Sequence, residues 1–125
     1  MSRKFEIVGS AFLDTASCAA SGARCPSPIS VSQIASNALH VPERTINSPV
    51  TWIDLLTANG FSEITGLLLN VASGSIELRV SSDLAVDQVI PVSGFHGFAS
   101  KTVGTELTAV AVRGVGTFEL MLAGT

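Results

Sequence analysis

Residues 75–82 constrain the fold of this chain more than any other stretch, because apolar and polar residues alternate there without a break. Ile76, Leu78 and Val80 alternate with Ser75, Glu77, Arg79 and Ser81. A period of two places the apolar set on one face of a β-strand and the polar set on the other. Half-buried strands of this kind are typical of antiparallel sheets. The stretch therefore predicts a chain built on antiparallel β-structure.

Further strands are predicted along most of the chain. They cover residues 4–9, 29–34, 63–71, 87–92, 106–113 and 117–122. The turn at 72–74 is expected to join 63–71 and 75–82 as a hairpin, the glycines at 114–116 turn the chain again, and Pro91 suits an edge strand. No helix follows each strand, which excludes a parallel βαβ architecture. The sequence thus predicts an all-β antiparallel sandwich, jelly-roll-like, with about eight short strands in two sheets.

One short helix is predicted at about residues 51–58. Thr51 is a capping residue with Asp54 three positions later, and Asn59-Gly60 supplies a stop. Trp52, Leu55 and Leu56 then share one helical face. We interpret the lone tryptophan as a plug in the core rather than a platform for a ligand.

The chain length of 125 residues indicates a single domain. Within it, residues 1–49 are expected to form an N-terminal strand plus an irregular arm, and residues 50–125 a compact β-body. Residues 14–28 are rich in small residues and contain two prolines, and residues 35–49 are broken by two more. An arm of this kind is ordered only where it lies on a neighbour.

Charged residues make up only 14% of the chain, against about 25% in a typical soluble domain. We therefore expect part of the surface to be covered by another subunit or by a partner, and we expect the protein to be a homo-oligomer. The net charge is −3 and no basic patch exists, which argues against nucleic-acid binding. No apolar run approaches the ~20 residues of a membrane span. No signal peptide is evident, so cytoplasmic synthesis is expected.

Polar residues that converge on a reaction centre are scarce, so we expect no enzyme, catalytic residue, cofactor or metal. His40 and His96 lie in different segments without metal-ligand spacing, and His96 is interpreted as a surface-turn residue. Cys18 and Cys25 do not have the spacing of a zinc pair. A disulfide between them is geometrically allowed, but cytosolic thiols are normally reduced, so free thiols are expected.

Three weaker signals carry other chemistry. Asp83 and Asp87 are oxygen ligands of the kind that calcium takes, but calcium loops are denser in acids. Glu63 and Glu77 are expected to face one another across the predicted hairpin, where solvated charges near an arginine are favoured over a glycosidase pair. The glycines at 114–116 lie between strands, so they indicate a turn rather than a phosphate loop.

The stretches 51–56, 61–71, 74–82 and 104–122, with their low charge and small polar residues, resemble small β-rich virion proteins of tailed bacteriophages. The similarity is to head cement or decoration proteins, a family that is jelly-roll-like and clamps neighbouring capsid subunits. It implies a structural virion protein at the capsid surface, made in the host cytoplasm. Its partners would be the major capsid protein, copies of itself, or both. No site residue of the family is transferred.

Two other function classes remain open. A β-sandwich interaction module of a phage tail, or a receptor- or glycan-binding protein, predicts an exposed aromatic cleft built from Phe95, His96 and Phe98. A small enzyme predicts clustered polar side chains in a pocket. Fold alone does not decide among these classes.

Overall fold

The computed structural model describes the backbone of residues 3–13, 25–100 and 104–125, and the side chains of residues 4–7, 35–100 and 104–125. This part of the chain holds seven strands and one 3-10 helix. The strands are β1 (Arg3–Leu13), β2 (Cys25–Ala35), β3 (Asn37–Asp54), β4 (Ile64–Ser81), β5 (Gln88–Val92), β6 (Phe95–Ala99) and β7 (Ala109–Gly124), and the 3-10 helix is η1 (Thr57–Asn59). All the strand pairs are antiparallel. The predicted all-β, antiparallel fold class is confirmed.

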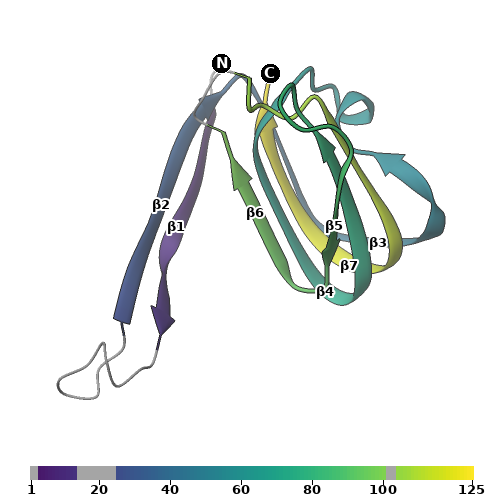
Figure 1. Ribbon diagram of the computed structural model, residues 1–125, viewed down its shortest axis with the longest axis horizontal. Helices are drawn as coiled ribbons and strands as arrows, with labels where there is room; N and C mark the ends of the chain where they lie inside the picture. Colours follow the sequence, from purple (N-terminus) through teal and green to yellow (C-terminus); the bar gives the residue numbers. More distant parts are fainter. Residues whose placement is uncertain (1–2, 14–24, 101–103) are drawn as a thin grey trace.

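The described strands belong to two sheets of very different size. β1 and β2 form a two-stranded hairpin that runs from the pair Arg3–Ala35 to the pair Leu13–Cys25. The body is a five-stranded sheet in the order β3-β7-β4-β5, with β6 also paired to β4. Figure 1 shows the hairpin as a separate ribbon beside the curved strands of the body.

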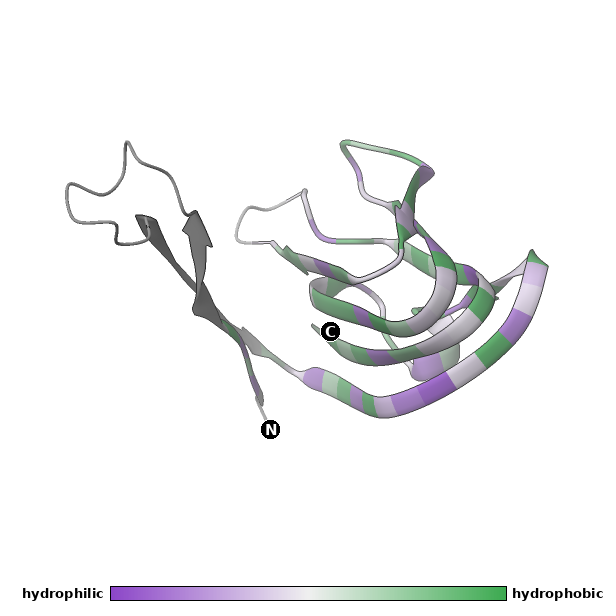
Figure 2. Ribbon diagram, turned by 90° about the horizontal axis from the view of Figure 1, so that it is seen from below, coloured by the Kyte–Doolittle hydropathy of each residue, from purple (hydrophilic) through white to green (hydrophobic). Residues whose placement is uncertain are grey.

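The body sheet is folded across one line, and its strands bend where they cross that line. β4 and β7 pair along almost their whole length, with Gly74 opposite Gly116 at the bend. On one side of them β3 shifts register between Ser48 and Ile53. On the other side Ser93 and Gly94 separate β5 from β6, which pair with the two ends of β4. Figure 2 shows the long strands as nested arcs.

The line across which the sheet bends divides the body into two half-sheets that face each other. The first half-sheet contains β6, the start of β4, the end of β7 and most of β3. The second half-sheet contains β5, the end of β4, the start of β7 and the last residues of β3. The prediction of two separate sheets is therefore wrong for the body, because hydrogen bonds continue through the bend.

Glycine makes this bend feasible. Gly74 has φ +82° and Gly114 has φ +133°, in the range that favours glycine. A Cβ on Gly74 would also collide with the backbone of Val115 and Gly116 on the neighbouring strand. Gly74, Gly114 and Gly116 thus mark bends within the continuous strands β4 and β7. The predicted hairpin of 63–71 with 75–82 is therefore wrong.

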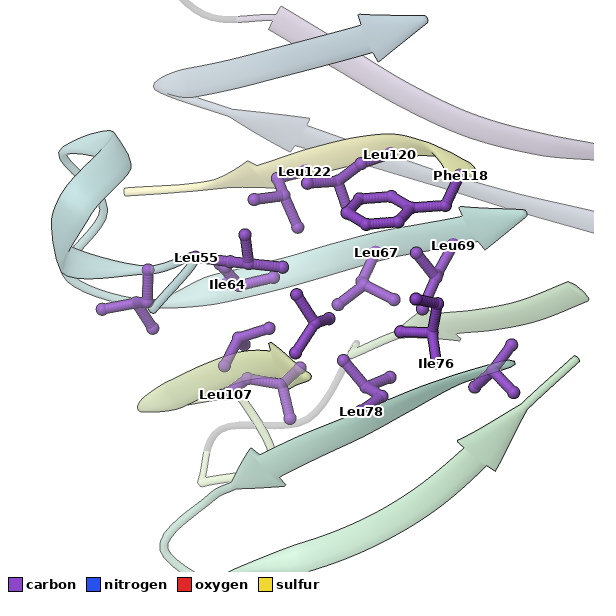
Figure 3. Packing of buried hydrophobic residues seen from close by; sticks show 14 of the residues in the cluster. Leu55, Ile64, Leu67, Leu69, Ile76, Leu78, Leu107, Phe118, Leu120 and Leu122 are labelled. Carbon is purple, nitrogen blue, oxygen red and sulfur yellow. The ribbon is translucent and has the colours of Figure 1, made fainter. Parts of the chain in front are cut away.

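The core fills the space between the two half-sheets. Figure 3 shows Phe118 and Leu120 of β7 pointing toward Ile76 and Leu78 of β4. The side chains in this cluster with at most 1% exposure are Leu55, Ile64, Leu67, Leu69, Ile76, Leu78, Val110, Val112, Phe118, Leu120 and Leu122. Glu77 and Arg79, which alternate with Ile76 and Leu78, remain partly exposed. The predicted alternation is therefore confirmed from Ile76 to Arg79, whereas Ser81, which was predicted on the polar face, is buried.

The predicted helix at 51–58 is wrong. β3 continues to Asp54, since Ile53 and Asp54 pair with β7. The Asp54 carboxylate then accepts hydrogen bonds from the backbone N–H of Leu56, at 3.0 Å, and of Ala58, at 2.9 Å. It thereby supports the single turn of η1, which ends at Gly60 in the left-handed conformation, as the predicted stop requires.

The predicted irregular segment at 35–49 is also wrong, because residues 37–49 belong to edge strand β3. Pro42 and Pro49 lie at the two register shifts of the β3–β7 pair. An edge strand tolerates proline, which has no N–H to donate, at a bulge.

The N-terminal strand and the strand at 29–34 are confirmed as parts of β1 and β2, and residues 25–28 extend β2 instead of forming a loop. Residues 14–24 of the predicted arm lie outside the described residues.

The base of the β1–β2 hairpin docks on the outer face of the first half-sheet. Phe5 is 7% exposed and forms a small cluster with Ala35 and Ala123, flanked by Ile7 and Met121. This cluster is separate from the core between the half-sheets. A single residue, Ser36, links β2 to β3.

Candidate functional site

An arginine–tryptophan stack lies on the outer face of the second half-sheet. The guanidinium carbons of Arg79 and Arg113 lie 4.5 and 4.3 Å from the centroid of the Trp52 ring. Nε of Arg113 also donates to Oε1 of Glu77 at 3.1 Å. The four side chains come from β3, β4 and β7, and all are partly exposed. We call this group the Trp52 stack.

The position of Trp52 corrects the prediction that it plugs the core. Strand pairing explains it: Ile53 lies opposite Val112, which is fully buried, so the neighbouring Trp52 points to the outer face. Residues 50–54 carry no clear apolar–polar alternation, since Trp52 and Ile53 are adjacent, so only the strand pairing decides which of them faces outward. Sequence reasoning therefore missed the convergence of Trp52 with Arg79 and Arg113.

A second candidate surface is the loop of residues 82–87, between β4 and β5. Its backbone is held by hydrogen bonds: Ser82 N–H donates to the Ala85 carbonyl at 2.7 Å, and Asp87 N–H donates to Ser81 Oγ at 2.9 Å. The apolar side chains at its tip are nevertheless exposed, Leu84 by 76% and Val86 by 70%. A rigid loop that presents apolar side chains to solvent is typical of a contact surface.

A third feature is an apolar pocket of about 220 Å³ that opens to solvent between the half-sheets, at the edge where β5 and β6 lie. Leu67, Leu78, Ile90, Phe98 and Leu107 contribute to its walls, and His96, Gln88 and Ser82 add polar atoms. His96 lies on β6 and is partly buried, so its interpretation as a surface-turn histidine is wrong.

The aromatic cleft predicted from residues 95, 96 and 98 is not assembled. Alternation along β6 places His96 and Phe98 at the apolar pocket between the half-sheets. Phe95 is 63% exposed on the opposite face. There it borders a groove of about 330 Å³ beneath the hairpin, with Ile7, Leu68 and Met121. Strand geometry therefore separates these rings.

The remaining predicted site residues are also dispersed. His40 lies on β3 and contacts the Glu119 carboxylate through Nε2 at 2.9 Å. Glu77 is paired with Arg113 instead of facing Glu63, which lies before β4 begins. The sequence predicted Arg79 as the arginine near Glu77, but the ion pair is formed by Arg113 on the adjacent strand.

Asp83 is exposed, whereas Asp87 Oδ1 accepts a hydrogen bond from Ser81 Oγ at 3.3 Å. Within the described residues, no three His, Cys, Asp or Glu side chains come close enough to hold a metal ion. Cys18 lies outside the described residues, and so does the side chain of Cys25, so their thiol state stays a prediction. No helix in the described part of the chain is long and apolar enough to span a membrane.

The described residues form an all-β, antiparallel fold whose candidate sites are the Trp52 stack, the loop of residues 82–87 and the apolar pocket between the half-sheets. No protein-family model, curated protein or solved structure matches the chain.

Replacing Trp52 by alanine is expected to lower the free energy of unfolding by about 1–2 kcal/mol, because two cation–π contacts of about 0.5–1 kcal/mol each are lost. Urea denaturation followed by circular dichroism measures this change. Trp52→Phe keeps an aromatic ring and should lose less. Equal stability of the alanine variant and the natural protein would show that the Trp52 stack does not stabilise the fold.

Proposed function

We propose that this chain is a structural virion protein that binds and stabilises a bacteriophage capsid shell through protein–protein contacts. Its partners are the major capsid protein, further copies of itself, or both. It is made in the host cytoplasm and acts at the capsid surface. The folded antiparallel sheet supports the finer comparison with jelly-roll cement proteins, since it brings two layers of strands face to face.

The observation that carries the proposal is the attachment of the β1–β2 hairpin. Ser36 alone joins it to β3. Among the described side chains, Phe5, Ile7 and Ala35 form its apolar contact with the body. A two-stranded ribbon is only marginally stable by itself in water. A long hairpin with a small contact at its base is therefore suited to lie on a neighbouring subunit.

The composition of the body surface supports the same function. Large apolar side chains are exposed at several places in the described part of the chain, namely Val50, Leu84, Val86, Val89, Phe95 and Val115. Charged residues amount to 14% of the whole chain. Stable interfaces between subunits are depleted in charge and enriched in apolar contacts.

Co-sedimentation with empty procapsids tests the proposal. The full chain is mixed with shells assembled from the capsid protein of the same virus, and the shells are pelleted. We expect saturable binding with a fixed number of copies per shell, and shells that withstand heat better than bare ones. A chain that stays in the supernatant at every concentration contradicts the proposed function.

Deleting residues 1–35 is expected to weaken shell binding by about tenfold or more, while the body still unfolds cooperatively. The deletion removes the hairpin and preserves β3, whose loss would expose a new sheet edge. Co-sedimentation measures binding, and thermal unfolding by circular dichroism is the folding control. Unchanged binding by a folded truncated chain would exclude the hairpin as the contact.

A further inference from the structure

Two neighbouring surfaces of the second half-sheet have complementary chemistry. One is the Trp52 stack, and the other is the loop of residues 82–87, which begins directly after β4 ends at Ser81. We propose that the loop of each copy docks on the Trp52 stack of a second copy, which produces a two-fold dimer. The inference rests on the self-association included in the proposed function, and it names the surface that performs it.

The receiving surface holds an arginine without an acidic partner among the residues that the structure describes. Arg113 is paired with Glu77, but Arg79 forms no ion pair with any residue in the described part of the chain. Its guanidinium is oriented by the Trp52 ring, 4.5 Å away. A planar guanidinium held in this way presents N–H donors that match the two oxygens of a carboxylate. Tryptophan and arginine are also the residues that dominate binding energy at protein interfaces.

The docking surface offers a carboxylate beside apolar side chains. Asp83 is exposed and is followed by Leu84, which is 76% exposed. Ser82 Oγ accepts hydrogen bonds from the backbone N–H of Leu84, at 3.3 Å, and of Ala85, at 3.2 Å. The loop is therefore held in shape before it binds, which lowers the entropic cost of association.

The two surfaces fit one another in charge and in polarity. The stack carries two cations and one anion, and the loop brings the Asp83 carboxylate to Arg79 and the Leu84 and Val86 side chains to the exposed part of the Trp52 ring. Because stack and loop lie next to each other on one half-sheet, a two-fold axis lets both contacts form at once.

Light scattering and sedimentation velocity of the purified full chain test this dimer. The natural protein should show dimer mass, and rising salt should shift it toward monomer. Arg79→Glu and Asp83→Arg should each weaken association by about tenfold or more, since each places like charges together in both contacts. The matched controls Arg44→Glu and Glu43→Arg make the same charge changes on β3 and should leave the mass unchanged.

Mixing the two variants tests the pairing of Arg79 with Asp83 directly. Loss of folding in either variant cannot explain the formation of a mixed dimer. In a pair with one Arg79→Glu chain and one Asp83→Arg chain, both contacts join opposite charges, so a mixed dimer should form. Native mass spectrometry identifies it, and the emission of Trp52, the only tryptophan in the chain, should change on mixing. A natural protein that is monomeric, variants that remain dimers, or variants that fail to pair would each overturn the inference.

Failure of this inference is separable from failure of the proposed function. A chain that binds procapsids as a monomer refutes only the dimer. A chain that dimerises through these surfaces and ignores procapsids refutes only the virion role. An acidic segment of another protein as the true occupant would appear as a monomeric natural protein, and that result also counts against the dimer.

Discussion

Replacing Gly74 by alanine is expected to destabilise the body by about 2–5 kcal/mol. Gly74 has φ +82°, and a Cβ there would also lie 2.7 Å from the Cα of Gly116 on β7. Because β4 and β7 bend together at this pair, neither strand can yield without opening the fold line. The loss is a large share of a stability of about 5–15 kcal/mol.

Urea and thermal denaturation measure this loss, and Gly94→Ala is the matched control. Gly94 lies at the same fold line, between β5 and β6, but no atom lies within 4 Å of a Cβ built there and its φ is not positive. Its substitution should change the free energy of unfolding by less than about 0.5 kcal/mol. Equal stability of the two variants would contradict the role of Gly74 at the bend.

Gly66→Ala is expected to undock the β1–β2 hairpin while the core stays folded. A Cβ at this position would lie 2.5–2.9 Å from three ring atoms of Phe5, so the ring has to move out of its present position on the outer face. Burial of a phenylalanine side chain contributes about 1.5–3 kcal/mol, and the rest of the docking cluster is small. The hairpin should therefore lose the largest described part of its contact with the body.

Hydrogen exchange measured along the chain tests this result. Backbone amides of β1 and β2 should lose protection in Gly66→Ala, and those of β4 and β7 should retain it. Phe5→Ala removes the ring from the other side of the contact and should have the same effect, whereas Gly94→Ala should leave the hairpin protected. Full hairpin protection in both Gly66→Ala and Phe5→Ala would show that this contact does not anchor the hairpin.

Much of the secondary structure could be predicted, because local patterns determine it. The period of two in residues 76–79 and the apolar face formed by Phe118, Leu120 and Leu122 are read correctly from sequence. Pro91 is placed correctly on an edge strand, since proline cannot donate to a central one. Asn59-Gly60 is likewise recognised as a stop.

The candidate surfaces were harder to predict, since they depend on which strands become neighbours. The Trp52 stack joins residues from β3, β4 and β7 that are up to 61 positions apart, as the numbers of Trp52 and Arg113 show. The spacing of Trp52, Leu55 and Leu56 fits a helix as well as the end of a strand. The pairing of Ile53 with Val112 places residues 52–54 in strand β3 instead of a helix.

By itself, then, the sequence determined the all-β antiparallel class, the alternation that separates core from surface, and the positions where glycine lets the backbone change direction. Only the tertiary structure decided that these glycines bend a continuous strand instead of ending it at a hairpin turn. A hairpin turn and a bend within one strand both accept a glycine with positive φ. They differ only in which strand the residues after the glycine pair with. The tertiary structure also decided that Arg79 and Arg113 meet at Trp52. Long-range pairing carries that information, and no local pattern contains it.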